Sequence, residues 1–577
     1  MVGKKLEIKG LLYRKLFKSE EKKEIKPKFY IKRVEKIELK KVSDITKIDV
    51  SYQLIENFVS VRIKWDPEKK EVVYNVIEPT LSEEDKKILE SLSEFLISVI
   101  DIDLSSIKDT ERVISYLENK IWEFINDYNI DIKPENYLKI FYYIYRNFVG
   151  LNEIEPLMQD PYIEDISCDG VGIPIYIIHR KYGTMRTNIV YNDIETLRDF
   201  IVKLSERCGR YVSYAEPILD ATLPDGSRVA ATIASDVATR GATFTIRKFS
   251  ERPFSPIEQV ELNTVSTEML AYLWYLIQHK SSGIIVGGTA TGKTSFLNSL
   301  AMFIPPEAKI VSIEDTRELR LAHQHWIAGL ARVGFGVPTP TGEKYGEVTL
   351  FDLLRETFRQ NPDYVIVGET RGEETYVMFQ GMASGHASLS TFHAGSLETF
   401  VKRITTPPIN LSPTLIESLN FIIVMTHAKE KGASARRVKE IIEIISVDPR
   451  TNEIATNVVF RWNPAEDKYE KVNDSVLVRR IAGSIGASYE EALREIERRK
   501  RVLDWLVNRG IKDYIEVNKI INEYYKEPLR IMEMIGETIP VKQAEIIKPS
   551  EEVKGRPKRV SILELLGFKF LKEKENV

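Results

Sequence analysis

Apolar residues recur in the first part of the chain with two different periods. Over residues 45–76 they alternate with polar residues, as at residues 59–63, and this alternation predicts strands with one buried face. From Ser82 onward the apolar residues are spaced three and four apart, and the same spacing returns over residues 113–124. Such spacing places them on one face of a helix that packs against a core. We therefore expect an N-terminal accessory domain over residues 46–148.

Strand and helix patterns are mixed over residues 151–249. Residues 175–178 predict a strand and residues 193–208 a helix. Further on, the Pro-Asp-Gly sequence at residues 224–226 predicts the turn of a β-hairpin. This mixture indicates an α+β unit.

Short, continuous apolar runs follow, which are typical of strands buried on both faces of a parallel sheet. They occupy residues 284–286, 309–313 and 363–369, and a helix is predicted before them over residues 267–279. Two prolines within residues 251–260 indicate a linker between this α/β part and the preceding unit.

The C-terminal part adds a strand and a long helix. Residues 436–444 begin as a basic turn and continue as a strand. Ser488 and Glu491 have the spacing of a capping box, which opens a helix that we expect to end at Gly510. The end of the chain is charged, with a short apolar patch at residues 562–570.

The length of 577 residues and the hydrophobic content of 43% allow more than one core, and a typical domain size suggests three or four units. We expect a basic arm, an accessory domain, an α+β domain, a linker, an α/β domain with a helical C-terminal part, and a charged tail. In this order they are residues 1–45, 46–148, 149–250, 251–260, 261–540 and 541–577.

Composition excludes several classes of protein. No apolar run approaches the roughly 20 residues of a membrane span, and the lysine-rich N-terminus lacks the apolar region of a secretory signal, so we expect a cytoplasmic protein. Two cysteines, Cys168 and Cys208, are too few for a disulfide framework or a four-cysteine zinc site. The net charge of −3 hides a basic segment over residues 1–41, which suits nucleic acid, anionic lipid or a solvated tail.

The most specific motif follows the strand predicted at residues 284–286. Residues 287–294 match G-x-x-x-x-G-K-[ST], with a strand before and a helix after. In this motif the glycines let backbone N–H groups surround phosphate oxygens, Lys293 reaches the β and γ phosphates, and the Thr294 hydroxyl can ligate Mg²⁺. The alternative, a chance glycine-rich turn, does not explain the agreement of the flanks. The predicted nucleotide-binding residues are Gly287, Gly288, Thr289, Ala290, Thr291, Gly292, Lys293, Thr294 and Ser295.

Carboxylates follow the next two predicted strands. Residues 314–318 are Glu-Asp-Thr-Arg-Glu, and Glu369 ends the third apolar run. At the carboxyl edge of an α/β sheet, such groups face the ligand crevice, where they hold Mg²⁺ through water or orient the attacking water. The alternative for each is a helix N-cap. Because both follow strands downstream of one P-loop, we favour the catalytic interpretation and place Glu314 at the bound nucleotide.

Four further residues stand out, although their types alone do not decide their roles. His386 and His393 lie seven apart around an apolar stretch, and without a third ligand nearby they are more typical of ordinary histidines than of a metal pair. Arg228 follows the predicted hairpin turn, and Arg247 ends a predicted strand. Arginines in such places usually lie in solvent or in local salt bridges, and a role at phosphate needs separate support.

Taken together, these motifs resemble the four sequence boxes of the type II/type IV secretion ATPase superfamily, most closely its archaeal branch of type IV pilus and archaellum motors. The boxes are the P-loop, residues 314–318, residues 355–371, and the histidine box that ends at residues 390–394. The resemblance covers about residues 151–450.

The resemblance implies an α/β fold with a RecA-like P-loop NTPase domain, preceded by a PAS-like α+β domain and the N-terminal accessory domain. It implies a homo-hexameric ATPase that uses ATP and Mg²⁺ to power assembly of a type IV pilus-like filament, or protein secretion. The implied partner is an integral-membrane platform protein, so the protein would be cytoplasmic and peripheral at the inner face of the cell membrane.

The resemblance also implies roles for individual residues. Glu318 matches the general base, and Glu369 matches the Walker B carboxylate, which reaches Mg²⁺ through water. The two histidines match a box that senses the γ-phosphate, and the two arginines match residues that reach ATP across a domain or subunit boundary. Closure of the domains would then gate hydrolysis. The catalytic residues implied in this way are Glu318, Glu369, Arg228, Arg247, His386 and His393.

Some features depart from the family pattern. Thr316 stands where many bacterial members have proline. Thr370 follows the Walker B carboxylate where isoleucine is common, and a tetracysteine zinc element is missing. No counterpart of the retraction-motor motif is found, which favours assembly or secretion. Two other functions stay open: a nucleic-acid translocase or conjugation-type ATPase, and a P-loop phosphotransferase. Nucleic acid is not expected as a partner because no OB-fold or RRM-type aromatic pattern is found.

Overall fold

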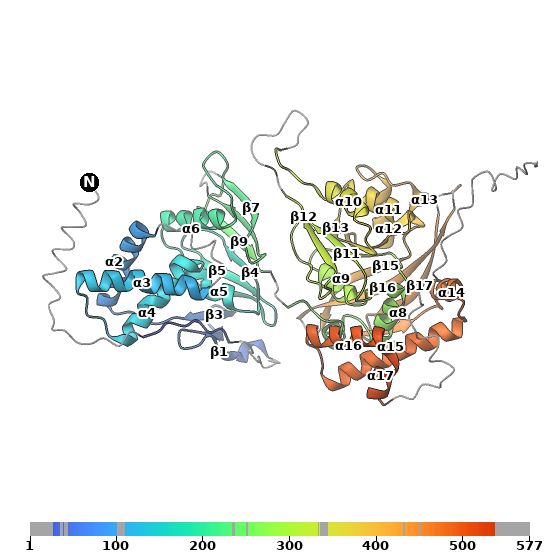
Figure 1. Cartoon of the computed structure of the whole chain (residues 1–577), viewed down its shortest axis with the longest axis horizontal. Coiled ribbons are helices and arrows are strands. Elements are labelled where there is room, and N and C mark those ends of the chain that lie inside the picture. Colours follow the sequence, from blue (N-terminus) through green and yellow to red (C-terminus); the bar gives the residue numbers. More distant parts are fainter. Residues whose placement is uncertain are drawn as a thin grey trace, which may run out of the picture. The chain divides into compact units, whose positions relative to one another are not determined.

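The computed structural model divides the chain into two compact units (Figure 1). The first comprises residues 1–251 with 316–318, and the second comprises residues 252–315 and 319–577. The predicted basic arm lies outside the described residues except at residues 27–34, 39, 44 and 45, and the predicted tail lies wholly outside them. The structure describes residues 27–34, 39, 44–100, 110–233, 237–249, 252–332, 334, 344–430, 433–448, 450–451 and 453–536.

The first unit is built on a nine-stranded sheet with the strand order β1-β2-β3-β6-β5-β4-β9-β8-β7. Neighbouring strands are antiparallel except β3 and β6, which are parallel. The strands are β1 Asp49–Ile55, β2 Val59–Asp66, β3 Glu71–Ile77, β4 Ile163–Cys168, β5 Pro174–His179, β6 Gly183–Val190, β7 Ile218–Thr222, β8 Arg228–Thr232 and β9 Thr243–Arg247.

The helices of the first unit pack on this sheet through one apolar cluster that extends from Phe29 to Ile246. A capping box at Ser82 opens α2, and Asp193 caps α6, as the sequence predicts for residues 193–208. The stretches predicted as separate domains, residues 46–148 and 149–250, therefore contribute to one sheet and one cluster. The helices are α2 Glu83–Val99, α3 Thr110–Tyr128, α4 Pro134–Ile144, α5 Glu155–Gln159 and α6 Ile194–Arg207, with short turns at Ile45–Lys47, Tyr145–Val149 and Asn152–Ile154.

The second unit contains another nine-stranded sheet, ordered β12-β11-β13-β14-β10-β15-β16-β17-β18. From β12 to β15 all neighbours are parallel, and from β15 to β18 they are antiparallel. The strands are β10 Gly283–Gly287, β11 Ile310–Glu314, β12 Trp326–Leu330, β13 Tyr364–Thr370, β14 Ala387–His393, β15 Phe421–Glu430, β16 Ala433–Val447, β17 Ile454–Asn463 and β18 Lys468–Lys471.

Helices cover both faces of this second sheet, which explains why its central strands are continuously apolar. Along β10, Ile285 belongs to the apolar cluster that contains α8, α9 and the C-terminal helices, whereas Ile284 and Val286 belong to the cluster that contains α10 to α13 (Figure 1). The unit is an α/β domain, with a mainly parallel sheet between two layers of helices. Its helices are α7 Pro256–Glu261, α8 Thr267–Gln278, α9 Lys293–Ala301, α10 Leu350–Arg359, α11 Glu374–Ala383, α12 Leu397–Thr405, α13 Pro413–Ile416, α14 Val476–Ser484, α15 Tyr489–Arg509, α16 Tyr514–Lys526 and α17 Pro528–Met534.

Two local predictions need correction. The basic residues at the start of 436–444 do not form a turn, because β16 already begins at Ala433 and pairs with β15 from Ala433 to Glu443. A helix, α7, begins at Pro256 inside the predicted linker, since Ser255 and Glu258 form a capping box and proline is tolerated in the first helical turn. The predicted capping box at Ser488 and the end at Gly510 are confirmed.

Within the described part of the chain, no helix combines the length and the apolar composition that a membrane crossing would require.

Candidate nucleotide-binding site

The glycine-rich loop connects β10 to α9 in the second unit. Gly292, just before α9, has a φ of 87°, which favours glycine, and Ala290 has a φ of 57°. Gly287 is needed for space, because a Cβ atom there would lie 2.5 Å from Thr291 Oγ1 and 3.0 Å from the Met425 carbonyl oxygen. The sequence therefore produces a tight turn at the end of a buried strand.

Hydrogen bonds within the loop use its carbonyl groups and spare its amides. Thr291 Oγ1 and Lys293 Nζ donate to the Gly288 carbonyl oxygen at 2.9 and 3.0 Å. Among the described residues, no acceptor is found for the backbone N–H groups of residues 289–291. With the N-terminus of α9 beside them, these amides can bind the oxygens of a phosphate chain.

Two neighbouring strands end at the same edge of the sheet as the loop. Gly287 pairs in register with His393, the last residue of β14, and β13 lies on the other side of β14. Glu369 is exposed near the end of β13. The structure thus brings Lys293, His393 and Glu369 to one edge, because parallel strands present their carboxyl ends together.

Two threonines fasten β13 to β14 near this edge. Thr391 Oγ1 donates to the Gly368 carbonyl oxygen at 2.7 Å, and Thr370 Oγ1 donates to the Thr391 carbonyl oxygen at 3.3 Å. Both threonines are buried. These hydrogen bonds fix the position of the backbone on both sides of Glu369. The spacing of residues in the sequence did not predict this role for the threonines.

The acidic box after β11 is partly structural. Glu314 is buried, and its Oε1 accepts a hydrogen bond from the Leu319 amide at 2.8 Å, which closes the segment between them. Asp315 forms an ion pair with Arg371, which follows β13. Glu318 is exposed within the closed segment. The geometry favours a structural role for Glu314. Glu318 and Glu369 are the remaining candidates to activate water or bind a metal.

His386 does not lie at the loop edge. It precedes the first residue of β14, seven residues from His393, and a strand of that length spans about 23 Å. Its ring packs edge-on against Phe358, with centroids 5.0 Å apart. Within one chain, therefore, only His393 of the two predicted histidines accompanies the glycine-rich loop.

Arg228 and Arg247 face each other across β8 and β9 in the first unit. Each forms an ion pair, Arg228 with Asp220 at 3.0 Å and Arg247 with Asp165 at 3.2 Å. All four side chains line a hollow of about 530 Å³ on this sheet. As the sequence suggested for strand-end arginines, local ion pairs form, and they do not by themselves indicate a phosphate site.

Two residues that sequence patterns missed contact the glycine-rich loop. His427 Nε2 lies 3.0 Å from the Thr289 carbonyl oxygen, and Arg436 Nε donates to the Ala290 carbonyl oxygen at 3.1 Å. They lie on β15 and β16 and are directly paired across those strands. Lying more than 130 positions along the chain from the loop, they had no local signal.

The site offers few protein ligands to a divalent metal. This is usual for Mg²⁺ in nucleotide sites, where phosphates supply further ligands. Among the described residues there is no group of three or more His, Cys, Asp or Glu side chains placed to hold a metal. The Thr294 hydroxyl in the first turn of α9 and the Glu369 carboxylate are the fitting donors, the latter through water.

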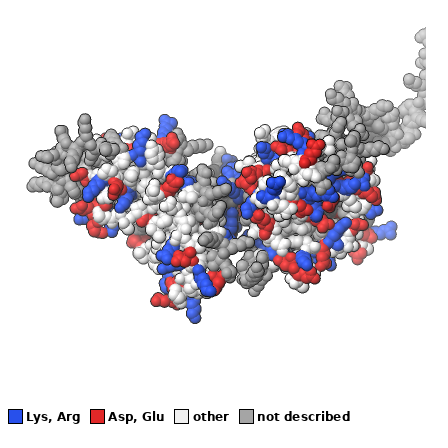
Figure 2. Space-filling model, turned by 90° about the horizontal axis from the view of Figure 1, so that it is seen from below, with Lys and Arg blue, Asp and Glu red and all other residues white. Residues whose placement is uncertain are grey.

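Charges of both signs are mixed on one face of the second unit. On the face shown in Figure 2, Lys and Arg side chains of this unit lie among Asp and Glu side chains.

Comparisons with known proteins agree with the motifs. Residues 151–436 match the family described as type II/IV secretion system protein, and residues 466–541 match the family described as PilB3-like, C-terminal. An "uncharacterized protein" of Methanocaldococcus jannaschii is 37% identical over 495 residues, covering 82% of this chain and 88% of that protein.

Two bacterial proteins complete the comparison. The type IV secretion system protein PtlH of Bordetella pertussis is 30% identical over 269 residues, covering 41% of this chain and 77% of PtlH. Among solved structures, the Legionella pneumophila ATPase DotB is 14% identical with a TM-score of 0.36, covering 66% of this chain and 93% of DotB.

Proposed function

Since the chain belongs to the family of type II/IV secretion system proteins, we propose that it is an ATP-hydrolysing motor of a type IV pilus-like assembly or secretion machine. One observation carries this proposal. The glycine-rich loop lies at the same sheet edge as Glu369 and His393, and it carries Lys293 and amides that have no acceptor among the described residues. That edge combines groups that bind a triphosphate with a carboxylate and an imidazole that can act on its terminal phosphate.

In the proposed reaction, each side chain has a separate task. The loop amides and Lys293 bind the phosphates. Thr294 and Glu369 would hold Mg²⁺, which would supply charge neutralisation at the phosphate oxygens. Glu318 takes the proton of the attacking water, and His393 contacts the γ-phosphate side of the site. Glu314 keeps the acidic box closed through the Leu319 amide. Preorganised groups of this kind stabilise the charge that develops during phosphoryl transfer.

The remaining elements of the proposal concern assembly. Arg228 and Arg247 of the first unit would add positive charge at the γ-phosphate, so that hydrolysis requires the two units, or two subunits of a hexamer, to close. The exposure of both arginine side chains supports this role, since they can exchange their carboxylate partners for phosphate. The work of closure would act on an integral-membrane platform protein from the cytoplasmic side.

The test is phosphate release from ATP by the purified full-length chain with Mg²⁺. The wild-type protein should release phosphate, and Lys293→Ala should lower the rate at least about 100-fold, because it removes a charge that contacts the transferred group. Lys468→Ala, which changes an exposed lysine on β18, is the matched control and should leave the rate unchanged. Hydrolysis that persists in Lys293→Ala would refute the site.

A further inference from the structure

The β15–β16 hairpin lies beside the P-loop strand and places two donors on the outer side of the loop. β15 is the parallel neighbour of β10, and His427 and Arg436 are opposite each other on the hairpin. Their targets are the carbonyl groups of consecutive residues, Thr289 and Ala290. Since a carbonyl oxygen only accepts, His427 Nε2 must carry a proton and donate.

The geometry of the peptide bond gives these contacts a consequence for phosphate binding. In a trans peptide, the carbonyl of one residue and the N–H of the next point in opposite directions. A donor that holds the Thr289 carbonyl outward therefore turns the Ala290 amide inward, and a donor on the Ala290 carbonyl does the same for the Thr291 amide. These two amides are among those without an acceptor in the described part of the chain.

The loop needs such support because its backbone is strained at one position. Ala290 has a φ of 57°, a left-handed conformation that is unfavourable for a residue with a Cβ atom. Arg436 also packs along the loop, since a Cβ atom built on Gly292 would lie 3.0 Å from Arg436 Cδ. The arginine thus contacts both the strained residue and the glycine that opens α9.

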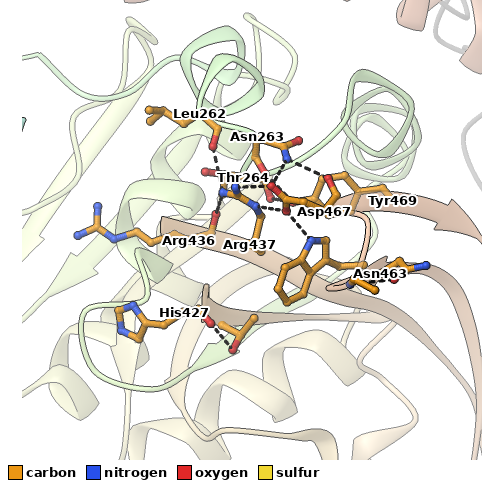
Figure 3. A network of polar contacts seen from close by, with 12 residues as sticks. Leu262, Asn263, Thr264, His427, Arg436, Arg437, Asn463, Asp467 and Tyr469 are labelled. Atoms are coloured by element: carbon orange, nitrogen blue, oxygen red, sulfur yellow. Dashed lines mark hydrogen bonds and ion pairs between the residues drawn. The ribbon is translucent and has the colours of Figure 1, made fainter. Parts of the chain in front are cut away.

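The strand that carries Arg436 is anchored by the next residue. Figure 3 shows the Arg437 side chain reaching Asp467, whereas the Arg436 side chain extends away from Asp467. Arg437 is fully buried and makes a two-pronged ion pair with Asp467, both N···O distances being 2.8 Å. It also donates to the Leu262 carbonyl oxygen at 3.1 Å. Because Arg437 cannot move without breaking these contacts, Arg436 is held toward the loop.

We propose that His427 and Arg436 are positioning residues that hold the P-loop amides of Ala290 and Thr291 toward the nucleotide phosphates. This inference rests on the proposed nucleotide-binding function. Arg436 has no carboxylate partner among the described residues, so its charge also favours an anion at the loop. Neither residue takes part in the chemical step, and their effect is on nucleotide binding.

The test compares ADP and ATP dissociation constants with turnover in the full-length chain. Arg436→Ala and His427→Ala should each weaken both nucleotides about 10-fold, as expected for one lost hydrogen bond to an oriented backbone group. At saturating ATP the turnover number should change less than about twofold, so the effect appears in KM. Arg436→Lys should recover most of the affinity, because an ammonium group can also donate to the Ala290 carbonyl.

The matched control is Arg461→Ala, which removes an exposed arginine from β17 that is paired with Glu440, and it should bind nucleotide like wild type. This inference would be overturned if folded Arg436→Ala and His427→Ala bound nucleotide within twofold of wild type. The proposed function would still stand if Lys293→Ala had lost binding. Wild-type binding in Lys293→Ala would overturn both. If Arg436→Ala does not fold, the Arg436→Lys and His427→Ala affinities decide.

Discussion

The two units each build a nine-stranded sheet, but they place their candidate functional residues differently. In the second unit, the strands from β12 to β15 are parallel, so the ends of β10, β13 and β14 meet at one edge and gather residues from distant parts of the sequence. In the first unit, nearly all neighbours are antiparallel, and Arg228 and Arg247 pair across a sheet face. Parallel pairing makes a crevice at an edge, whereas antiparallel pairing makes a surface.

The same contrast holds for charge. Beside the P-loop, Arg436 donates to the Ala290 carbonyl oxygen and has no carboxylate partner among the described residues. In the first unit, Arg228 and Arg247 donate to carboxylates. A cation on a neutral carbonyl keeps its charge for an incoming anion, while a cation on a carboxylate must first exchange partners. Because the Arg228–Asp220 pair is exposed on both sides, that exchange costs it only about 0–1 kcal/mol, whereas Asp165 in the second pair is half-buried. On the proposed function, the cations of the second unit serve nucleotide binding and those of the first unit serve rate acceleration.

The largest expected effect tests that division. Arg228→Ala combined with Arg247→Ala should lower the turnover number about 1000-fold, within the range for arginines that stabilise phosphoryl transfer, with ADP affinity changed less than threefold. Single-turnover hydrolysis and equilibrium ADP binding measure the two quantities. Arg62→Ala, in an exposed pair with Asp49 on the same sheet, serves as control. An unchanged turnover number would show that the first-unit arginines form structural ion pairs only.

Glu369→Gln tests whether the carboxylate of the second unit acts in hydrolysis rather than in ATP binding. We expect turnover to fall about 100-fold while ATP still binds, because the amide keeps the size of the side chain but loses the charge that acts on metal and water. ATP retained after gel filtration would be the direct readout. Glu373→Gln changes an exposed carboxylate nearby and should behave like wild type. Loss of ATP binding in Glu369→Gln would instead place Glu369 in binding.

Asp467→Asn should destabilise the hairpin that faces the P-loop. Removing one partner of a buried ion pair costs about 3–5 kcal/mol, and we expect about 3 kcal/mol because the Asp467 side chain is 39% exposed. Hydrogen exchange of β16 and β17 should therefore speed up about 100-fold at pH 7. Asp474→Asn changes an exposed surface pair and should leave this exchange unchanged. Unchanged exchange in Asp467→Asn would show that the Arg437–Asp467 pair does not stabilise the hairpin.

The same variant has a defined pH dependence. Hydrogen bonds from Arg437 hold the pKa of Asp467 well below its ordinary value of 3.8. A carboxyl group with a lowered folded-state pKa contributes stability above its unfolded pKa and loses it as pH falls through the folded value. The difference between wild type and Asp467→Asn should thus be full at pH 7 and smaller at pH 3. An equal difference at both pH values would contradict a charge-based role.

The smallest effect concerns the carboxylates of the first unit. Asp220→Asn should raise the hydrolysis rate about two- to threefold at subsaturating ATP, because Arg228 no longer exchanges a charged partner for phosphate. Steady-state kcat/KM measures this change. Asp49→Asn removes the carboxylate of the Arg62 pair and is the matched control. A lower rate in Asp220→Asn would show that Asp220 orients the arginine rather than competing for it.

Local patterns predicted local structure well. The apolar run at residues 284–286, the helix over residues 267–279 and the capping box at Ser488 all appear where periodicity and capping chemistry indicate. The family resemblance is confirmed by the match over residues 151–436. Predictions failed where a residue was assigned from local charge or proline content, as at the start of residues 436–444 and at Pro256.

The candidate site was only partly predictable. Lys293 was identified from the P-loop motif and Glu369 from its place at the end of an apolar run. Strand order then brings both to one edge of the sheet. His386 was grouped with His393 by their spacing in the sequence, but the length of β14 separates the two side chains. His427 and Arg436 had no motif to reveal them.

By itself, the sequence determined the glycine-rich loop, the strands around it and the family, because hydrophobic period, glycine conformation and capping act over a few residues. Only the tertiary structure decided that a distant hairpin supports the loop and that Glu314 braces the acidic box, because strand pairing and burial join residues that are far apart in the chain. It also decided which partners the cations have, and those partners determine whether a positive charge is available to an anion.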